Sequence, residues 1–231
     1  MITKADDIRD EWKRYFQDLY TPKMNPRFDR EFKERVDNEI ENIEKITFTT
    51  EELIMKTPIT EEEVKRTLHK LKLKKAPGWD GVVTEHIKYG GARLLQCLTM
   101  IYKLITEYEH IPLYFKKGII VPIPKADKNQ MLKDNYRGLT LLPVIGKLYE
   151  KIVMYRVEEF SRRKELINKC QGAGKENCSN LQVAWVIKEA IAYNREKGKT
   201  VYVGVLDAKK AYDTVWQNGL FYELFHCGIQ G

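Results

Sequence analysis

One carboxylate at the end of an apolar segment has the setting of a phosphoryl-transfer residue. Asp207 directly follows residues 200–206, an apolar, β-branched run whose composition predicts a buried strand. A carboxylate in this place reaches into a site while the sheet holds its backbone, which suits a ligand of Mg²⁺. An aspartate that caps the following helix is the alternative, and the residue taken alone leaves both interpretations open.

Two further extended segments are predicted upstream of this strand. Residues 118–124 form a β-branched run between prolines, residues 136–142 form another extended candidate, and a polar loop joins the two. This pattern predicts a β-hairpin. Because Pro122 lacks a backbone N–H donor, its strand is expected at the edge of a sheet.

Apolar residues at helical spacing predict the helices around these strands. Thr60 and Glu63 form a capping box that marks the start of one helix, and Ile59 and Val64 are placed to form its hydrophobic staple. Further helices are expected near residues 8–19, 94–108, 144–160 and 181–197. Residues 27–57 are polar and acid-rich, and we expect a partly ordered linker that can hold one helix.

The composition narrows the class of protein. The chain has 231 residues, 43% hydrophobic and 32% charged, which permits a folded core and excludes collagen-like and fully disordered chains. No apolar run approaches the roughly 20 residues that span a bilayer, and the charged N-terminus does not resemble a secretory signal. We therefore expect an intracellular protein, in the nucleus or the cytoplasm, without membrane contact. The four cysteines have neither metal-ligand nor disulfide spacing and are expected to be reduced thiols.

Positive charge is concentrated in one part of the chain. The formal net charge is +7 overall, −4 over residues 27–66 and +4 over residues 110–137. A local excess of lysine and arginine favours contact with a polyanion such as nucleic acid. We therefore expect the polyanion contacts in the second half of the sequence.

Six sequence blocks follow one another between residues 74 and 216. The blocks are Lys75-Ala76-Pro77-Gly78-x-Asp80-Gly81, Val121-Pro122-Ile123-Pro124-Lys125, Asn135-Tyr136-Arg137-Gly138-Leu139-Thr140-Leu141-Leu142, Gly146-Lys147-Leu148-x-Glu150-Lys151-Ile152, Gln171-Gly172, and Leu206-Asp207-x-x-Lys210-Ala211-Tyr212-Asp213-x-Val215-Trp216. In this order they resemble the reverse transcriptases encoded by non-LTR retrotransposons. The last block resembles the first catalytic motif of that family.

The resemblance implies roles for individual residues of an RNA-directed DNA polymerase. Asp207 would bind the two Mg²⁺ ions that activate the primer 3′-hydroxyl and neutralise the leaving pyrophosphate. Lys125 and Arg137 match the cations that hold the triphosphate of the incoming deoxynucleotide, the arginine as a bidentate fork and the lysine as a point charge. Tyr212 matches an aromatic ring that lies under the sugar and excludes a ribose 2′-hydroxyl. Taken singly, the two cations could be ordinary surface charges and Tyr212 a core aromatic.

The resemblance also implies contact with nucleic acid. Gln171 and Gly172 match a segment that touches the template strand, where small residues let the backbone approach the sugar-phosphate chain. The implied partners are an RNA template, a DNA primer and deoxynucleoside triphosphates. The sequence departs from the family pattern at residues 173–175, where many members have Gly-Phe and a basic residue, and at Gly138, where proline is common.

The implied fold is a mixed α/β arrangement. Residues 60–231 correspond to the fingers and an incomplete palm of a right-hand polymerase, and residues 1–59 to a helical extension and linker. The palm strand that ends at Asp207 would lack partner strands, so we expect an exposed sheet edge and apolar face.

Catalysis by these residues alone is not expected. The family's second carboxylate motif, Tyr-x-Asp-Asp, does not occur in the 231 residues, and one aspartate cannot hold two ions and a triphosphate. The remaining palm and the thumb would be supplied in cis or be absent. The competing function is binding of RNA or an RNA/DNA hybrid without chemistry. An unrelated Mg²⁺-dependent phosphohydrolase ranks third, because residues 207–209 hold no second carboxylate suited to it.

Overall fold

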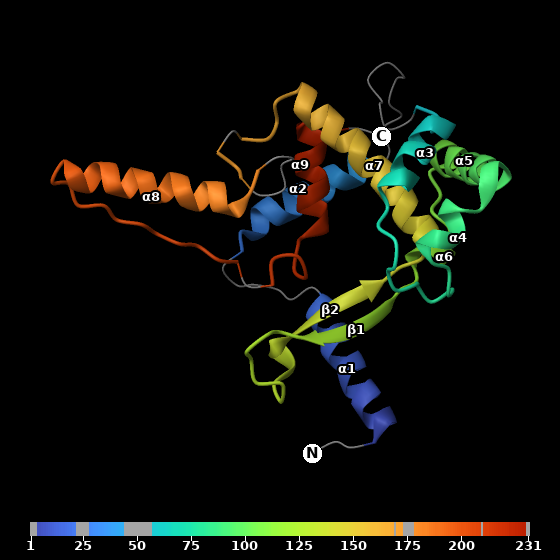
Figure 1. Cartoon of the computed structure of the whole chain (residues 1–231), viewed down its shortest axis with the longest axis horizontal. Coiled ribbons are helices and arrows are strands. Elements are labelled where there is room, and N and C mark those ends of the chain that lie inside the picture. Colours follow the sequence, from blue (N-terminus) through green and yellow to red (C-terminus); the bar gives the residue numbers. More distant parts are fainter. Residues whose placement is uncertain are drawn as a thin grey trace. The chain divides into compact units, whose positions relative to one another are not determined.

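The computed structural model describes residues 4–21, 28–43, 57–168, 170–172, 178–208 and 210–229. The chain forms two compact units (Figure 1). One consists of Met1–Phe160 together with Asp213–Gly231, and the other of Ser161–Tyr212.

The described residues are mostly helical, with one small sheet. In chain order the elements are α1 (Ala5–Tyr20), α2 (Arg30–Ile43), α3 (Glu61–Lys70), α4 (Thr84–Lys88), α5 (Gly91–Tyr108), α6 (Leu113–Lys116), β1 (Ile119–Pro124), the 3-10 turn η1 (Lys133–Asn135), β2 (Tyr136–Leu141), α7 (Val144–Arg163), α8 (Asn180–Glu196) and α9 (Gln217–His226). The five helices and the hairpin predicted from periodicity are confirmed. The acid-rich linker holds one helix, α2, and the rest of it at residues 44–56 lies outside the described part.

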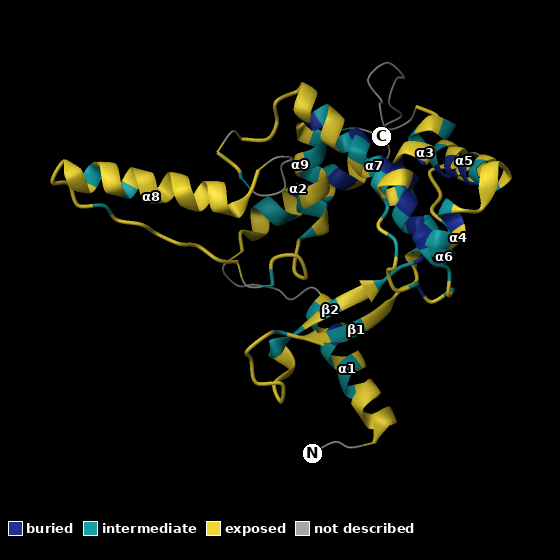
Figure 2. Cartoon of the chain, in the orientation of Figure 1, coloured by how far each residue is buried: buried dark blue, intermediate teal, exposed yellow. Residues whose placement is uncertain are grey.

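The hydrophobic core of the first unit lies between α3, α4, α5 and α7, where the buried residues in Figure 2 are concentrated. Its buried members are Ile59, Val64, Leu68, Ile87, Leu98, Tyr102, Ile105, Val144, Leu148 and Ile152. Tyr102 is completely buried, and its hydroxyl donates to the carbonyl oxygen of Ile145 at 2.8 Å. This bond ties α5 to α7 and satisfies a hydroxyl that would otherwise be buried without a partner.

Helix α3 begins as its sequence predicts. The Thr60 hydroxyl accepts from the backbone amide of Glu63 at 3.2 Å, and the Glu63 carboxylate accepts from the amide of Thr60 at 2.9 Å. Ile59 and Val64, the two residues of the predicted staple, are both buried in the core. The capping box therefore supplies partners for two amides that the first turn of a helix leaves free.

Helix α2 of the N-terminal region packs against α9. Asn218 Nδ2 donates to Asp37 Oδ1 at 2.8 Å, and His226 Nε2 lies 2.9 Å from Glu39 Oε1. Trp216, just before α9, contacts the ring of Phe28 at a centroid distance of 5.2 Å. The helices α2 and α9, which are far apart in the sequence, thus pack directly against each other.

The predicted strand at residues 200–206 is wrong. In the second unit these residues have irregular backbone, and the side chains of Tyr202 and Val205 are 91% and 86% exposed. Among the described residues, β1 and β2 pair only with each other, so this segment has no neighbouring strand. An unpaired strand buries neither its backbone groups nor its apolar side chains, and intrinsic β-propensity does not make up for that loss.

No helix in the described ranges is long and apolar enough to span a bilayer.

Candidate functional site

The β-hairpin carries two of the predicted site residues. Strands β1 and β2 are antiparallel, and Ile123 is paired with Arg137 and Pro124 with Tyr136. The amide of Lys125 donates to the carbonyl of Asn135 at 2.8 Å, which extends the pairing by one more residue. Because side chains alternate between the faces of a strand, this register places Lys125 and Arg137 on the same face of the hairpin.

The two cations have different surroundings. The Lys125 ammonium donates to the carbonyl oxygen of Asp134 at 2.7 Å, so its position is held by the loop that follows it. Arg137 is exposed, and its guanidinium makes no hydrogen bond or ion pair with any residue that the structure describes. An exposed guanidinium of this kind has five N–H donors and can bind two oxygens of an oxyanion at once.

The loop between the strands is held by its own hydrogen bonds. Asn135 Nδ2 donates to the carbonyl of Asn129 at 2.8 Å, and the Tyr136 hydroxyl donates to that of Gln130 at 3.0 Å. Exposed Lys128 lies on the same loop. The hairpin thus presents several positive charges on a defined backbone, an arrangement suited to binding phosphate groups.

Asp207 and Tyr212 lie in a solvent-exposed segment of the second unit that forms neither helix nor strand. Asp207 is exposed in the irregular segment that follows residue 206, and Tyr212 is 98% exposed in the next turn. The alternative that Tyr212 is a core aromatic is therefore wrong. Asp207 likewise does not cap a helix, since the next helix, α9, begins at Gln217.

Gln171 and Gly172 precede α8. Gln171 is exposed, and its amide donates to the carbonyl of Asn168 at 3.1 Å. A Cβ atom at position 172 would lie 2.2 Å from Cγ2 of Val183, so the close approach of α8 accounts for the glycine. Residues 173–175, where the sequence departs from the family pattern, lie outside the described residues.

The structure brings together Lys125 and Arg137, on one hairpin of the first unit. Asp207, Tyr212, Gln171 and Gly172 belong to the second unit. Within the described part of the chain, no three His, Cys, Asp or Glu side chains gather in a way that could hold a metal ion.

Two of the sequence blocks meet just after the end of β2. A Cβ at Gly78 would lie 2.7 Å from the backbone of both Leu142 and Pro143, so only glycine allows this approach. The Tyr114 hydroxyl donates to the Asp80 carboxylate, and this hydrogen bond raises the pKa of Tyr114 to about 12. The turn at residues 75–81 thereby supports the point where β2 leads into α7.

Part of the chain matches a known family, and a longer stretch is similar to named proteins. Residues 123–231 match the family described as reverse transcriptase (RNA-dependent DNA polymerase). The chain is 32% identical over 167 residues to an RNA-directed DNA polymerase from mobile element jockey of Drosophila melanogaster, a match that covers 71% of this chain and 18% of that protein. The chain carries a reverse transcriptase domain of the non-LTR retrotransposon family.

Further relatives support this assignment. The chain is 32% identical over 169 residues to an RNA-directed DNA polymerase from mobile element jockey of Drosophila funebris, a match that covers 72% of this chain and 18% of that protein. It is 26% identical over 163 residues to a probable RNA-directed DNA polymerase from transposon BS of Drosophila melanogaster, covering 71% and 18%. The chain thus spans 18% of the length of these relatives.

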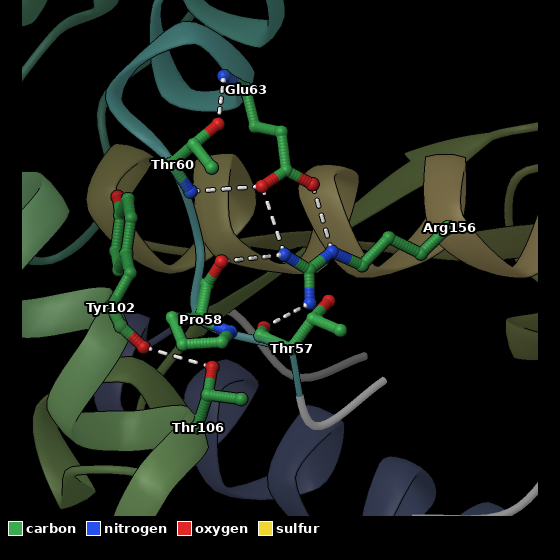
Figure 3. A network of polar contacts seen from close by, with 7 residues as sticks. All are labelled: Thr57, Pro58, Thr60, Glu63, Tyr102, Thr106 and Arg156. Atoms are coloured by element: carbon green, nitrogen blue, oxygen red, sulfur yellow. Dashed lines mark hydrogen bonds and ion pairs between the residues drawn. The ribbon is translucent and has the colours of Figure 1, made fainter. Parts of the chain in front are cut away.

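Sequence reasoning missed one polar network, which joins α7 to the start of α3 (Figure 3). Arg156 of α7 contacts both carboxylate oxygens of Glu63, each at 2.8 Å, and donates to the carbonyl oxygen of Thr57 at 2.7 Å. Burial raises the pKa of Glu63, but the hydrogen bonds from Arg156 and from the Thr60 amide outweigh it and hold that pKa below its ordinary value. A signal was present, because Arg156 lies one turn after Ile152 on the apolar stripe of its helix.

Proposed function

We propose that this chain forms the fingers and the first part of the palm of a right-hand polymerase that copies RNA into DNA. Residues 60–231 make up this region, and residues 1–59 are an N-terminal extension. The observation that carries the proposal is the hairpin, which places Lys125 and Arg137 on one face within blocks that match the family. The substrates are an RNA template, a DNA primer and deoxynucleoside triphosphates.

Lys125 and Arg137 bind the triphosphate of the incoming nucleotide. Support comes from their common face, from the fixed position of the lysine and from the absence of an intrachain partner for Arg137 among the described residues. A planar guanidinium binds two phosphate oxygens at once, whereas an ammonium acts as a point charge. Together they would neutralise and orient the triphosphate.

Asp207, Tyr212, Gln171 and Gly172 take their proposed roles from the family resemblance. Asp207 contributes one carboxylate to magnesium binding, and Tyr212 lies against the sugar of the nucleotide. The exposure of both side chains leaves them accessible to a ligand. Gln171 and Gly172 contact the template, although packing against Val183 is sufficient to explain the glycine.

The 231 residues by themselves are proposed to bind nucleic acid without extending a primer. The net charge of +4 over residues 110–137 and the exposed cations of the hairpin favour binding. The absence of a Tyr-x-Asp-Asp sequence from these residues is the reason to expect no extension. Binding of RNA or an RNA/DNA hybrid is thus the second candidate function of this polypeptide.

The test uses the 231-residue chain, a labelled RNA/DNA hybrid and Mg²⁺–dTTP. Hybrid affinity is measured by fluorescence anisotropy over a salt series, and we expect a steep loss with salt because counterions are released on binding. Titration calorimetry then compares Mg²⁺–dTTP binding by the unchanged chain, by Lys125→Gln with Arg137→Gln, and by Lys128→Gln as a control for the loss of loop charge.

The double variant should weaken dTTP binding by about tenfold or more, and the control by much less. Equal effects of the double variant and the control would reject the assigned cation roles. No hybrid binding at low salt would reject the nucleic-acid function. Robust Mg²⁺-dependent primer extension would contradict the expected inactivity of this polypeptide.

A further inference from the structure

Helix α1 lies across the hairpin and contacts it through aromatic side chains (Figure 1). The ring centroids of Trp12 and Tyr136 are 4.8 Å apart, and Trp12 also lies against Phe16. Phe16 is only 5% exposed, although it is not a member of the hydrophobic core formed by α3, α4, α5 and α7. The hairpin therefore buries the apolar face of this helix.

Gly138 forms a notch in β2 that receives Phe16. A Cβ atom at position 138 would lie 2.8 Å from Cε1 of Phe16 and 3.0 Å from the hydroxyl oxygen of Tyr20. Such distances require a neighbouring group to move.

Arg137 sits between two residues that α1 contacts. Tyr136 and Gly138 are half-buried on the face that meets α1, while Arg137 is exposed on the opposite face. This alternation follows from the two-residue period of a strand. Contact on one face therefore holds the strand backbone from which the Arg137 side chain projects on the other face.

The loop that holds Lys125 is tied to the same helix. The Tyr15 hydroxyl lies 3.1 Å from Oδ1 of Asp134, and Glu11 forms an ion pair with Lys133. The carbonyl of Asp134 in turn accepts the hydrogen bond from the Lys125 ammonium. One residue of the loop thus contacts both α1 and the lysine.

We propose that α1 is a brace that holds Lys125 and Arg137 in the geometry that binds a triphosphate, with Phe16 and Tyr15 as positioning residues. The inference rests on the proposed triphosphate role of the two cations. It assigns the N-terminal extension a part in nucleotide binding although none of its residues touches the nucleotide. It also explains why glycine suits position 138 of this chain.

The experiment measures Mg²⁺–dTTP affinity by calorimetry and backbone amide exchange by mass spectrometry on the full 231-residue chain. Phe16→Ala removes the ring from the notch, Tyr15→Phe removes only the hydroxyl, and Gln17→Ala changes an exposed residue of the same helix as a control. We expect Phe16→Ala to weaken dTTP binding by about threefold to tenfold, Tyr15→Phe by less, and Gln17→Ala not at all. Exchange in β2 should rise with Phe16→Ala while the core helices stay protected.

A compensating pair separates positioning from general loss of structure. Gly138→Ala should weaken binding as Phe16→Ala does, and combining it with Phe16→Leu should restore affinity because the shorter side chain vacates the notch. In a background with Lys125→Gln and Arg137→Gln, the substitution Phe16→Ala should have no further effect on affinity.

The outcomes distinguish this inference from the proposed function. If Lys125→Gln with Arg137→Gln leaves dTTP affinity unchanged, the cation roles fail and the brace fails with them. If that double variant weakens binding but Phe16→Ala does not, the brace is overturned and the cation roles stand. An equal effect of Phe16→Ala with and without the cations, or unchanged exchange in β2, would also overturn the brace.

Discussion

The contact between Arg156 and Glu63 gives the sharpest test of how the first unit is held together. Glu63→Gln removes the negative charge but keeps the length of the side chain and an oxygen that can accept from the Thr60 amide. The Arg156 side chain is only 9% exposed and that of Glu63 is 22% exposed. The substitution therefore leaves a nearly buried guanidinium without its carboxylate.

The expected loss of stability follows from this burial. Removing one partner of a fully buried ion pair costs about 3–5 kcal/mol, and an exposed pair contributes less than about 1 kcal/mol. Arg156 keeps its hydrogen bonds to the carbonyls of Thr57 and Pro58, and Glu63 is partly solvated, so we expect a loss of about 2–3 kcal/mol. At about 2–4 °C for each kcal/mol, the melting temperature should fall by roughly 4–12 °C.

The assay is chemical and thermal denaturation followed by circular dichroism, with Glu62→Gln as the matched control. Glu62 lies in the same first turn of α3, carries the same charge and is exposed. A double-mutant cycle of Glu63→Gln and Arg156→Met isolates the interaction of the pair. If Glu63→Gln and Glu62→Gln lower the free energy of unfolding equally, the ion pair does not stabilise the unit and the reasoning is refuted.

The same pair makes stability depend on pH. The folded state lowers the pKa of Glu63 from its ordinary value of 4.5, so the unfolded chain takes up a proton on this residue before the folded chain does. The contribution of ionised Glu63 to the free energy of unfolding is fully present above pH 4.5. It is lost as the pH falls through the lower pKa that this residue has in the folded state. Glu63→Gln should therefore flatten the acid side of the stability profile, as measured by denaturation at a series of pH values.

Three further predictions concern packing and thiols. Gly78→Ala should destabilise the chain by about 1–3 kcal/mol because its Cβ meets the backbone of Leu142, whereas Gly204→Ala, which meets no atom within 4 Å, should be neutral in the same denaturation assay. Trp216→Ala should lower the free energy of unfolding by about 2–4 kcal/mol and increase amide exchange in α2, because the ring packs against Phe28. Unchanged amide exchange in α2 would show that this contact is not stabilising. All four cysteines are free and exposed, so a thiol reagent should titrate four groups in the native chain, and fewer would contradict the structure.

Local sequence was sufficient to predict most of the helices and the hairpin. The period of apolar residues predicts α5 and α7, and the capping box of Thr60 and Glu63 predicts the start of α3 to the residue. These signals involve residues within a few positions of one another, so the sequence carries them whatever the rest of the chain does. The blocks that identify the family are also local.

The strand predicted at residues 200–206 shows where this reasoning stops. Its composition is that of a buried strand, yet Tyr202 and Val205 are exposed and the backbone is irregular. Strand formation requires a neighbour in space that can accept and donate the backbone hydrogen bonds. Periodicity reports on the side chains of one segment and contains no information about that neighbour.

The sequence by itself predicted five helices, the hairpin and the resemblance to the family, but not α4, α6 or α9. Tertiary structure alone decided that Phe16 occupies the notch at Gly138, that α2 packs on α9, and that Arg156 reaches Glu63. Each of these contacts joins residues about 90 to 180 positions apart. Their partners are selected by shape, by burial and by the need to satisfy buried charge, and those conditions exist only once the elements have packed together.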